Sequence, residues 1–243
     1  MNILITGATS GIGYQLAIDY VEQLHNVIVM GRNKSILAEL ARKGCNAIEI
    51  DISNYEDCQK KFNEISQQVP CLDIVILNAG ICEYIDTKNF TASIFKKTYD
   101  INIMGLVNCI EFTLPLIRKS QIRHLVGTAS LSQYLPFYRA SAYGSSKIAI
   151  DYILNSLAVD LSPEKIHVSV INPGFVKTPM TNKNDFNMPF IINVTDASIA
   201  IRKGIANKSI DIHFPKKLSY LLKFFNILPN IIKRKISLIL SKH

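Results

Sequence analysis

Close to the N-terminus of this 243-residue chain stands the segment Thr6-Gly7-Ala8-Thr9-Ser10-Gly11-Ile12-Gly13, directly after the apolar run Ile3-Leu4-Ile5 and before a pattern typical of a helix. A strand that ends in glycines and turns at once into a helix builds an anion site, because the backbone can approach a pyrophosphate and the helix N-terminus offers free N–H groups. A tight loop can have a similar glycine-rich sequence, so the interpretation depends on the strand and helix patterns that flank the glycines. We therefore predict dinucleotide contacts from Gly7, Thr9, Ser10, Gly11, Ile12 and Gly13.

Apolar runs and helical patterns alternate along the rest of the chain. Alternation of this kind predicts βαβ units, right-handed crossovers and a Rossmann-type α/β fold with a doubly wound, mainly parallel sheet. Ligands of such sheets bind at the carboxyl ends of the strands. We expect seven strands near 3–5, 27–30, 47–50, 72–77, 124–127, 166–171 and 210–214, and helices near 11–24, 35–43, 55–68, 92–119 and 141–160.

Length and charge favour one domain, residues 1–213, followed by a basic amphipathic tail, residues 214–243. The net charge is +8, yet the tail holds seven basic residues and no acid, so the body is nearly neutral. Charge confined to one end is not the footprint of a nucleic-acid-binding face, and we expect no nucleic-acid partner. No repeat or linker marks a second domain, and because Met1 leads straight into the first strand we expect no targeting peptide.

The five cysteines are odd in number and form no Cys-x-x-Cys pair. They are typical of reduced thiols in a cytosolic protein, and we expect neither a disulfide frame nor a metal site. The expected location is the cytoplasm, or the inner face of a membrane as a peripheral protein.

Gly31-Arg32-Asn33 follows the second strand, where a dinucleotide fold places either an acid for the ribose 2′-hydroxyl or an arginine for a 2′-phosphate. Arg32 stands there and no acid does. Because a guanidinium grips phosphate with two hydrogen bonds, the sequence favours NADP(H) over NAD(H). The alternative is an arginine that only caps or solvates the loop.

Polar residues also follow the third and fourth strands. Asp51 is placed to accept a hydrogen bond from an adenine amino group, or to cap the next helix in competition with Ser53. Asn78-Ala79-Gly80 either lets the backbone approach the adenosine ribose or forms a simple turn.

Ser130 follows the fifth strand, and Tyr143-Gly144-Ser145-Ser146-Lys147 stands thirteen residues later. Tyr and Lys four residues apart share one face of a helix. An ammonium beside the phenol favours the phenolate, so we expect a Tyr143 pKa lowered towards neutrality and a usable proton donor and acceptor. The pair alone is common by chance, and its neighbours give it weight.

Together these segments resemble the compact short-chain dehydrogenases/reductases, from Met1 to about Phe214. The resemblance rests on Thr6–Gly13, Asp51, Asn78-Ala79-Gly80, Asn102, Ser130, Tyr143 with Lys147, and Asn172-Pro173-Gly174 with Thr178. It departs mildly at Leu77, where the family usually has Asn, and at Ala129, where a second Ser is common.

The resemblance implies a role for each member of a catalytic tetrad. Tyr143 would be the general acid/base, Ser130 would bind the substrate carbonyl, Lys147 would hold the nicotinamide ribose, and Asn102 would anchor a relay water. It also implies cofactor contacts at Tyr143, Lys147, Pro173, Gly174, Val176 and Thr178, and a homodimer or homotetramer.

The expected substrate wall is apolar. It comprises residues 131–138, Phe175 and the loop 179–194, and the predicted contacts are Ser132, Tyr134, Phe175 and Met180. A small hydrophobic carbonyl or alcohol suits such a wall, so we expect an NADP(H)-dependent oxidoreductase that reduces a hydrophobic ketone or aldehyde by hydride transfer.

Two other functions share parts of this pattern. A non-catalytic NADP(H) sensor or membrane-associated scaffold would be suggested by erosion of Ser130, Tyr143 or Lys147, and all three are present. A nucleotide-sugar epimerase shares the Tyr-Lys pair but needs a large C-terminal substrate domain, which the 65 residues after Thr178 are too few to form.

The tail has apolar residues at helical spacing, Leu218, Leu221, Leu222 and Phe225, then Ile232, Ile236, Ile239 and Leu240 after Pro229. A basic amphipathic helix can lie in the interface of an anionic membrane, and no apolar run in the tail is long enough to span one. The equal alternative is that this stripe packs on the protein's own core or on a partner subunit. Membrane contact through residues 216–243 is therefore left open.

Overall fold

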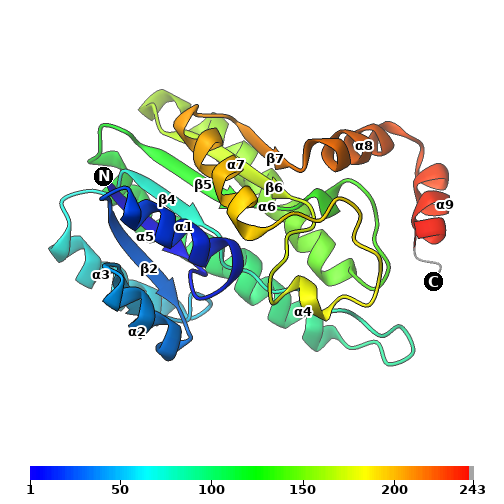
Figure 1. Cartoon of the computed structure of the whole chain (residues 1–243), viewed down its shortest axis with the longest axis horizontal. Coiled ribbons are helices and arrows are strands. Elements are labelled where there is room, and N and C mark those ends of the chain that lie inside the picture. The colour runs from blue at the N-terminus through cyan, green and yellow to red at the C-terminus, as the bar shows by residue number, and fades with distance from the viewer. Residues whose placement is uncertain (241–243) are drawn as a thin grey trace.

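The centre of the molecule is one parallel sheet with the strand order β3-β2-β1-β4-β5-β6-β7, seen in a computed structural model that describes residues 1–240 (Figure 1). The predicted doubly wound fold is confirmed, because the order reverses between β1 and β4. The strands of this sheet are β1 (Asn2–Thr6), β2 (Asn26–Gly31), β3 (Asn46–Glu49), β4 (Ile74–Leu77), β5 (His124–Thr128), β6 (His167–Pro173) and β7 (Asp211–Phe214).

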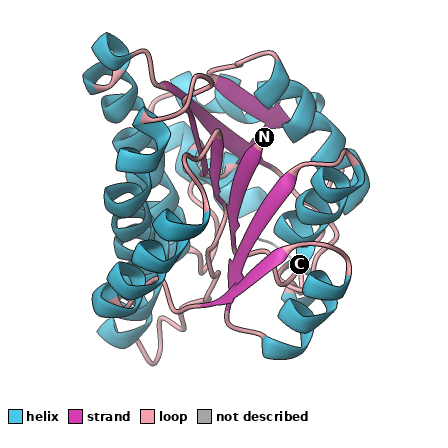
Figure 2. Cartoon of the chain, turned by 90° about the vertical axis from the view of Figure 1, so that its left-hand side faces the viewer, coloured by secondary structure: helices cyan, strands magenta, loops and turns pink. Residues whose placement is uncertain are grey.

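Helices cover both faces of the sheet (Figure 2). One face packs against α3, α5 and α6, and the other against α1, α2 and α7. A π-helical turn, Asp100–Met104, joins α4 to α5. The helices are α1 (Gly11–Glu22), α2 (Lys34–Arg42), α3 (Tyr55–Gln68), α4 (Ala92–Tyr99), α5 (Gly105–Arg118), α6 (Ser141–Asp160), α7 (Val194–Ala206), α8 (Lys216–Ile227) and α9 (Asn230–Leu240).

Strand side chains alternate between two cores. In β1, Ile3 and Ile5 face the α1–α7 side, whereas Leu4 faces the α5 side. Because successive side chains of a strand point to opposite faces and both faces are covered, the strand is apolar at every position. This explains why the strands were readable as short continuous apolar runs.

The strand order also places the functional edge. Leu4 of β1 lies between Ile28 of β2 and Val75 of β4, so the loops after β1 and β4 leave the sheet side by side. This is the point at which the winding reverses, where ligands of open α/β sheets bind.

Three local features differ from the sequence predictions. No helix was predicted between the sixth and seventh strands, yet α7 buries Ala197, Ile201 and Ile205 against the sheet. The predicted helix near 92–119 is interrupted by the π-helical turn. Asn54, rather than Asp51 or Ser53, caps α3, since its side chain accepts a hydrogen bond from the Asp57 N–H at 2.9 Å.

The interrupted helix Ala92–Arg118 is long and apolar enough, by length and composition, to cross a membrane. Half of its most apolar window is buried inside the structure, and Leu106, Cys109 and Ile117 belong to the core. A core helix of a globular domain has the same composition.

The tail forms α8 and α9, which extend from the end of the sheet (Figure 1). Leu218 and Leu222 of α8 form a small core with Leu131 and Leu135. Part of the predicted apolar stripe therefore packs on the protein itself. Lys242, which was counted in the basic tail, lies outside the described residues.

Candidate active site

A cleft of about 430 Å³ lies at the carboxyl ends of the strands, where a doubly wound sheet is expected to bind its ligand. It brings together residues that the chain spreads from Gly7 to Thr181. The predicted site residues that line it are Gly7, Thr9, Ser10, Gly11, Ile12, Arg32, Asp51, Asn78, Ala79, Gly80, Ser130, Tyr143, Lys147, Pro173, Gly174, Val176, Thr178 and Met180.

The glycine loop packs so closely that side chains are excluded from it. A Cβ on Gly7, whose φ is +65°, would lie 2.6 Å from the Cα of Ala79. A Cβ on Gly13, which lies beneath the cleft rather than on its surface, would lie 2.5 Å from the carbonyl oxygen of Gly7. The loop is therefore bare backbone, as close approach to a pyrophosphate requires.

The N-terminus of α1 faces the same loop. Ser10 is its N-cap residue but makes no side-chain cap hydrogen bond, and Gly11 and Ile12 of the first turn line the cleft. N–H groups in the first turn of a helix have no intrahelical acceptor. They are available to an anionic ligand, so the cradle fits a dinucleotide pyrophosphate.

Thr6 joins the loop after β1 to the loop after β4, a role that the sequence analysis missed. Its Oγ1 accepts hydrogen bonds from the backbone N–H groups of Asn78, at 3.0 Å, and Ala79, at 3.1 Å. The Asn78 side chain in turn donates to the carbonyl oxygens of Thr6 and Gly7, both at 3.3 Å. Asn78 thus holds the glycine loop in place, and the available signal was a hydroxyl residue at the last position of the strand.

Arg32 and Asp51 stand together at one end of the cleft, with 3.9 Å between the guanidinium and the carboxylate. Partial burial acts to raise the pKa of Asp51, but hydrogen bonds from Ser53 and the charge of Arg32 outweigh this effect and lower it. The Arg32 side chain is 60% exposed, and so remains accessible to a ligand phosphate.

Tyr143 and Lys147 lie one turn apart near the start of α6, and the Lys147 Nζ is 5.6 Å from the centre of the Tyr143 ring. Nζ donates a hydrogen bond of 2.8 Å to the carbonyl oxygen of Thr128. Burial lowers the pKa of Lys147 to about 8.

The pKa of Tyr143 is the main correction to the sequence analysis. We expected the neighbouring ammonium to lower it, but burial raises it well above its ordinary value, and a hydrogen bond with Ser130 opposes this only in part. The cleft desolvates the phenolate, and the Lys147 hydrogen bond goes to the backbone instead. In the free protein Tyr143 is therefore a protonated phenol.

Asn102 is fully buried in the π-helical turn. Its Oδ1 accepts from the Ile81 N–H at 2.8 Å, and its Nδ2 donates to the Ile81 carbonyl oxygen and to Ser146 Oγ, both at 3.0 Å. The side chain thereby fixes the loop after β4 against α6. Single π-helical turns are frequent at functional sites, and this one aims an otherwise internal side chain at the cleft loop.

Cys82 is a neighbour of the site that the sequence analysis treated as an ordinary thiol. Its charge would act on both Tyr143 and Lys147. Burial raises the pKa of Cys82 to about 11, so the thiol stays protonated at neutral pH. The available signal was its place two residues after Gly80.

Of the predicted substrate contacts, Met180 lines the cleft, whereas Ser132, Tyr134 and Phe175 are not among its lining residues. The Ser132 N–H donates to Ser130 Oγ at 3.1 Å. Phe175 packs on the small core beneath α8, together with Tyr134. Substrate contact by these three residues stays a prediction.

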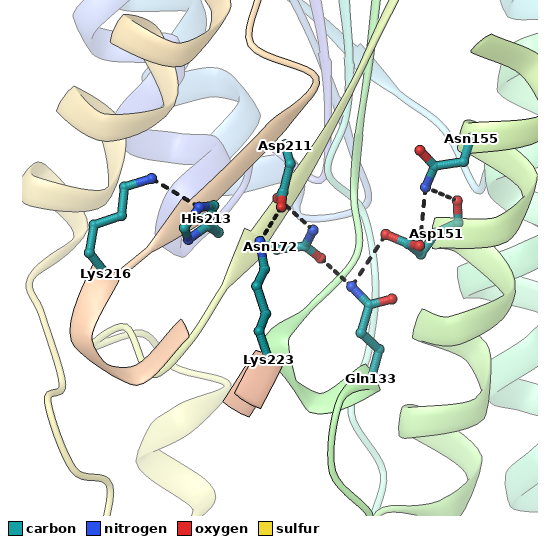
Figure 3. A network of polar contacts seen from close by, with 8 residues as sticks. All are labelled: Gln133, Asp151, Asn155, Asn172, Asp211, His213, Lys216 and Lys223. Carbon is teal, nitrogen blue, oxygen red and sulfur yellow. Dashed lines mark hydrogen bonds and ion pairs between the residues drawn. The ribbon is translucent and has the colours of Figure 1, made fainter. Parts of the chain in front are cut away.

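A polar network connects α6, the two last strands and the tail (Figure 3). Gln133 donates to Asp151 at 3.3 Å and to Asn172 at 2.8 Å, and Asn172 donates to Asp211 at 3.0 Å. Lys223 of α8 completes the chain with an ion pair of 2.5 Å to Asp211. The network links the segment after Ser130 to α6, β6, β7 and the tail.

Two further observations bear on the chemistry. All five cysteines are free thiols. Within residues 1–240, no group of three or more His, Cys, Asp or Glu side chains is placed to hold a metal ion.

A family model described as short chain dehydrogenase matches residues 1–188. The curated protein 11-beta-hydroxysteroid dehydrogenase-like 2 from Arabidopsis thaliana is 31% identical in an alignment that covers 95% of this chain and 78% of the relative. An uncharacterized oxidoreductase from Myxococcus xanthus is 29% identical over 93% of this chain and 92% of its own. Among solved structures, the 3-ketoacyl-(acyl-carrier-protein) reductase from Brucella melitensis complexed with NADH superposes with a TM-score of 0.82 at 20% identity, covering 90% of this chain and 98% of that one.

Proposed function

This chain belongs to the short-chain dehydrogenase family, and from that premise we propose that it is an NADP(H)-dependent reductase of a hydrophobic ketone or aldehyde. The observation that carries the proposal is one cleft that is lined by Arg32 after β2, by the bare glycine loop after β1, and by the Ser130, Tyr143 and Lys147 side chains beyond β4. A dinucleotide bound in this cleft would place its phosphates on the glycine loop.

When bound, the cofactor would supply or accept the hydride. The side chains of the cleft would donate or accept the proton. Burial keeps Tyr143 protonated, so in the reductive direction its phenol donates a proton to the oxygen of the carbonyl as charge develops there. Ser130 lies beside Tyr143 and stabilises the same oxygen with a hydrogen bond. Its Oγ accepts from the Ser132 N–H, and the hydroxyl proton that hydrogen-bonds Tyr143 in the free protein would be donated to the substrate oxygen.

Lys147 and Asn102 hold the geometry of the cleft. Lys147 carries a positive charge close to the phenol below its pKa of about 8. A Cβ on Gly80 would lie 3.3 Å from Asn102 Oδ1 and 3.4 Å from Lys147 Nζ, so both side chains reach the backbone of this loop. Asn102 therefore positions the loop on which the reacting groups converge.

Arg32 supports a preference for NADP(H). Its guanidinium is accessible at the end of the cleft, and the neighbouring carboxylate of Asp51 already accepts two hydrogen bonds from Ser53. A 2′-phosphate placed beside Arg32 would gain a charge-assisted, bidentate contact. Steady-state kinetics with both cofactors test this point, and a higher kcat/KM with NADH than with NADPH would overturn it.

The nature of the substrate is proposed from the lining and from the relatives. Ile81, Ile101 and Met180 contribute apolar side chains to the lining of the cleft. The plant relatives named 11-beta-hydroxysteroid dehydrogenase-like point in the same direction. We therefore favour a hydrophobic carbonyl compound over a sugar or a keto acid.

The test is NADPH consumption by the purified protein against a panel of hydrophobic ketones, aldehydes and quinones, with Tyr143→Phe as the matched variant. We expect turnover by the wild-type protein, and a loss of at least a hundredfold in the variant with NADPH binding retained. Equal turnover by both proteins would refute the role of Tyr143. Tight NADPH binding without turnover on the whole panel would favour a sensor instead.

A further inference from the structure

The C-terminal helices have one face that the protein uses and one that it leaves in solvent. On the inner face of α8, Leu218 and Leu222 are buried against Leu131 and Leu135. The ion pair between Lys223 and Asp211 fixes the same helix to the edge of the sheet (Figure 3). The helix is therefore held in one orientation.

That orientation exposes a second apolar stripe. Tyr220, Phe224 and Ile227 recur at the spacing of one helix face, and they are 62%, 60% and 83% exposed. On α9 the exposed apolar residues include Ile231 and Ile239, both 68% exposed. We call these five residues the outer tail face.

The two helices that carry the outer tail face are strongly basic. Residues 215–240 hold six basic residues and no acid. Lys223 forms an ion pair with Asp211, whereas the other five have no carboxylate partner among the residues that the structure describes. These five are Lys216, Lys217, Lys233, Arg234 and Lys235.

We propose that the outer tail face docks on an anionic lipid surface. Exposed aromatic and aliphatic residues on helices rich in lysine and arginine suit the interface of a bilayer with negative headgroups. A second copy of this chain would bring two clusters of positive charge together, and like charges disfavour that contact. Helices of 12 and 11 residues are too short to span a bilayer, so the tail would lie on the surface.

This docking is independent of the proposed reaction, although it has a consequence for it. Leu131, which α8 covers from its inner side, is the residue directly after Ser130. A docked molecule would therefore hold the reacting end of its cleft close to the lipid surface.

Vesicle flotation with the full-length protein tests the proposal. The vesicles are phosphatidylcholine alone, or phosphatidylcholine with about one-third phosphatidylserine. One variant removes apolar surface, Phe224→Ser with Ile227→Ser, and its matched control is Ile199→Ser, at an exposed apolar position on α7. A second variant removes charge, Lys233→Gln, Arg234→Gln and Lys235→Gln, and its control removes three exposed lysines elsewhere, Lys60→Gln, Lys88→Gln and Lys119→Gln.

We expect binding to the anionic vesicles that weakens with salt and is weak on neutral ones. The charge variant should lose on the order of tenfold to a hundredfold in partitioning, since each basic residue near such a surface contributes several-fold. The apolar variant should lose at least about fivefold, and both controls should bind like wild type. Circular dichroism and NADPH binding, measured on the same samples, separate a folding or active-site defect from a loss of docking.

Equal partitioning onto neutral and anionic vesicles, or onto neither, would overturn the proposal. So would a concentration-dependent dimer that Phe224→Ser with Ile227→Ser abolishes in light scattering, because it would assign the outer tail face to a second copy of the chain.

Discussion

Lys147 should make the free protein more stable in mildly alkaline solution. The side chain is 3% exposed, and burial lowers its pKa from 10.5 to about 8. Below pH 8 the lysine is charged in both the folded and the unfolded chain, so the folded state bears the full cost of burying the charge. As the pH rises from about 8 to 10.5, the folded protein loses this proton while the unfolded chain retains it, and the free energy of unfolding increases.

The size of this increase follows from the two pKa values. The full cost is about 3 kcal/mol, because one pKa unit corresponds to about 1.4 kcal/mol. Between about pH 7.5 and pH 9.5 roughly 2 kcal/mol of it is relieved. Tyr143 and Cys82 act in the opposite sense, since burial raises their pKa values and the folded protein keeps their protons longer than the unfolded chain does.

The assay is urea unfolding of the cofactor-free protein at the two pH values, for wild type and for Lys147→Met. The variant keeps Tyr143 and Cys82, so the difference between the two proteins isolates Lys147. Wild type should gain about 2 kcal/mol relative to the variant between the two pH values. Lys60→Met, at an exposed position, should follow wild type. Parallel pH dependence of wild type and Lys147→Met would refute the argument that burial sets this pKa.

Three further predictions concern the cofactor end, the loop junction and the tail. Arg32→Ala should lower kcat/KM with NADPH by about tenfold and leave NADH unaffected; an equal loss with both cofactors would contradict a phosphate contact. Thr6→Val leaves the two N–H groups after β4 without their acceptor and should cost about 2 kcal/mol in urea unfolding, and an unchanged midpoint would count against the junction. Leu222→Ala, at a 3% exposed position, should cost about 3 kcal/mol, whereas Phe224→Ser on the exposed face should cost almost nothing; similar losses from both would mean that α8 is oriented differently.

Much of the fold was predictable because the strong signals are local. Apolar runs such as Ile3-Leu4-Ile5 are strands buried on both faces, and the glycines that follow reveal where the loop must stay bare. The helix α7 was missed because its buried face consists of Ala197, Ile201 and Ile205 interrupted by Ser198 and Gly204. A stripe this thin gives a weak periodic signal, and only the sheet that it covers stabilises it.

The sequence was sufficient to predict which side chains of the site lie together, but not how far the cleft shields them from solvent. Four-residue spacing correctly placed Tyr143 and Lys147 on one face of α6. Whether an ammonium lowers the pKa of a phenol depends on solvent exposure, which is a property of the assembled cleft. The sequence also could not identify the cap of α3, because several neighbouring polar residues could have adopted the backbone geometry that Asn54 has.

The tail shows the same limit. Its sequence contained one amphipathic pattern with two open interpretations, packing on the core or contact with a membrane. The structure assigns Leu218 and Leu222 to packing on the core and leaves Phe224 and Ile227 in solvent. A helix with two apolar stripes cannot be assigned from periodicity alone, because the partner of each stripe lies elsewhere in the chain.

The position of β1 also matters during synthesis on the ribosome. β1 is translated before both of its neighbours in the sheet, β2 on one side and β4, which begins at Ile74, on the other. A nascent chain that ends before this point keeps the apolar edge Ile3-Leu4-Ile5 unpaired. Unpaired apolar edges promote aggregation. We expect translation between β2 and β4 to be the interval in which this protein most needs a chaperone.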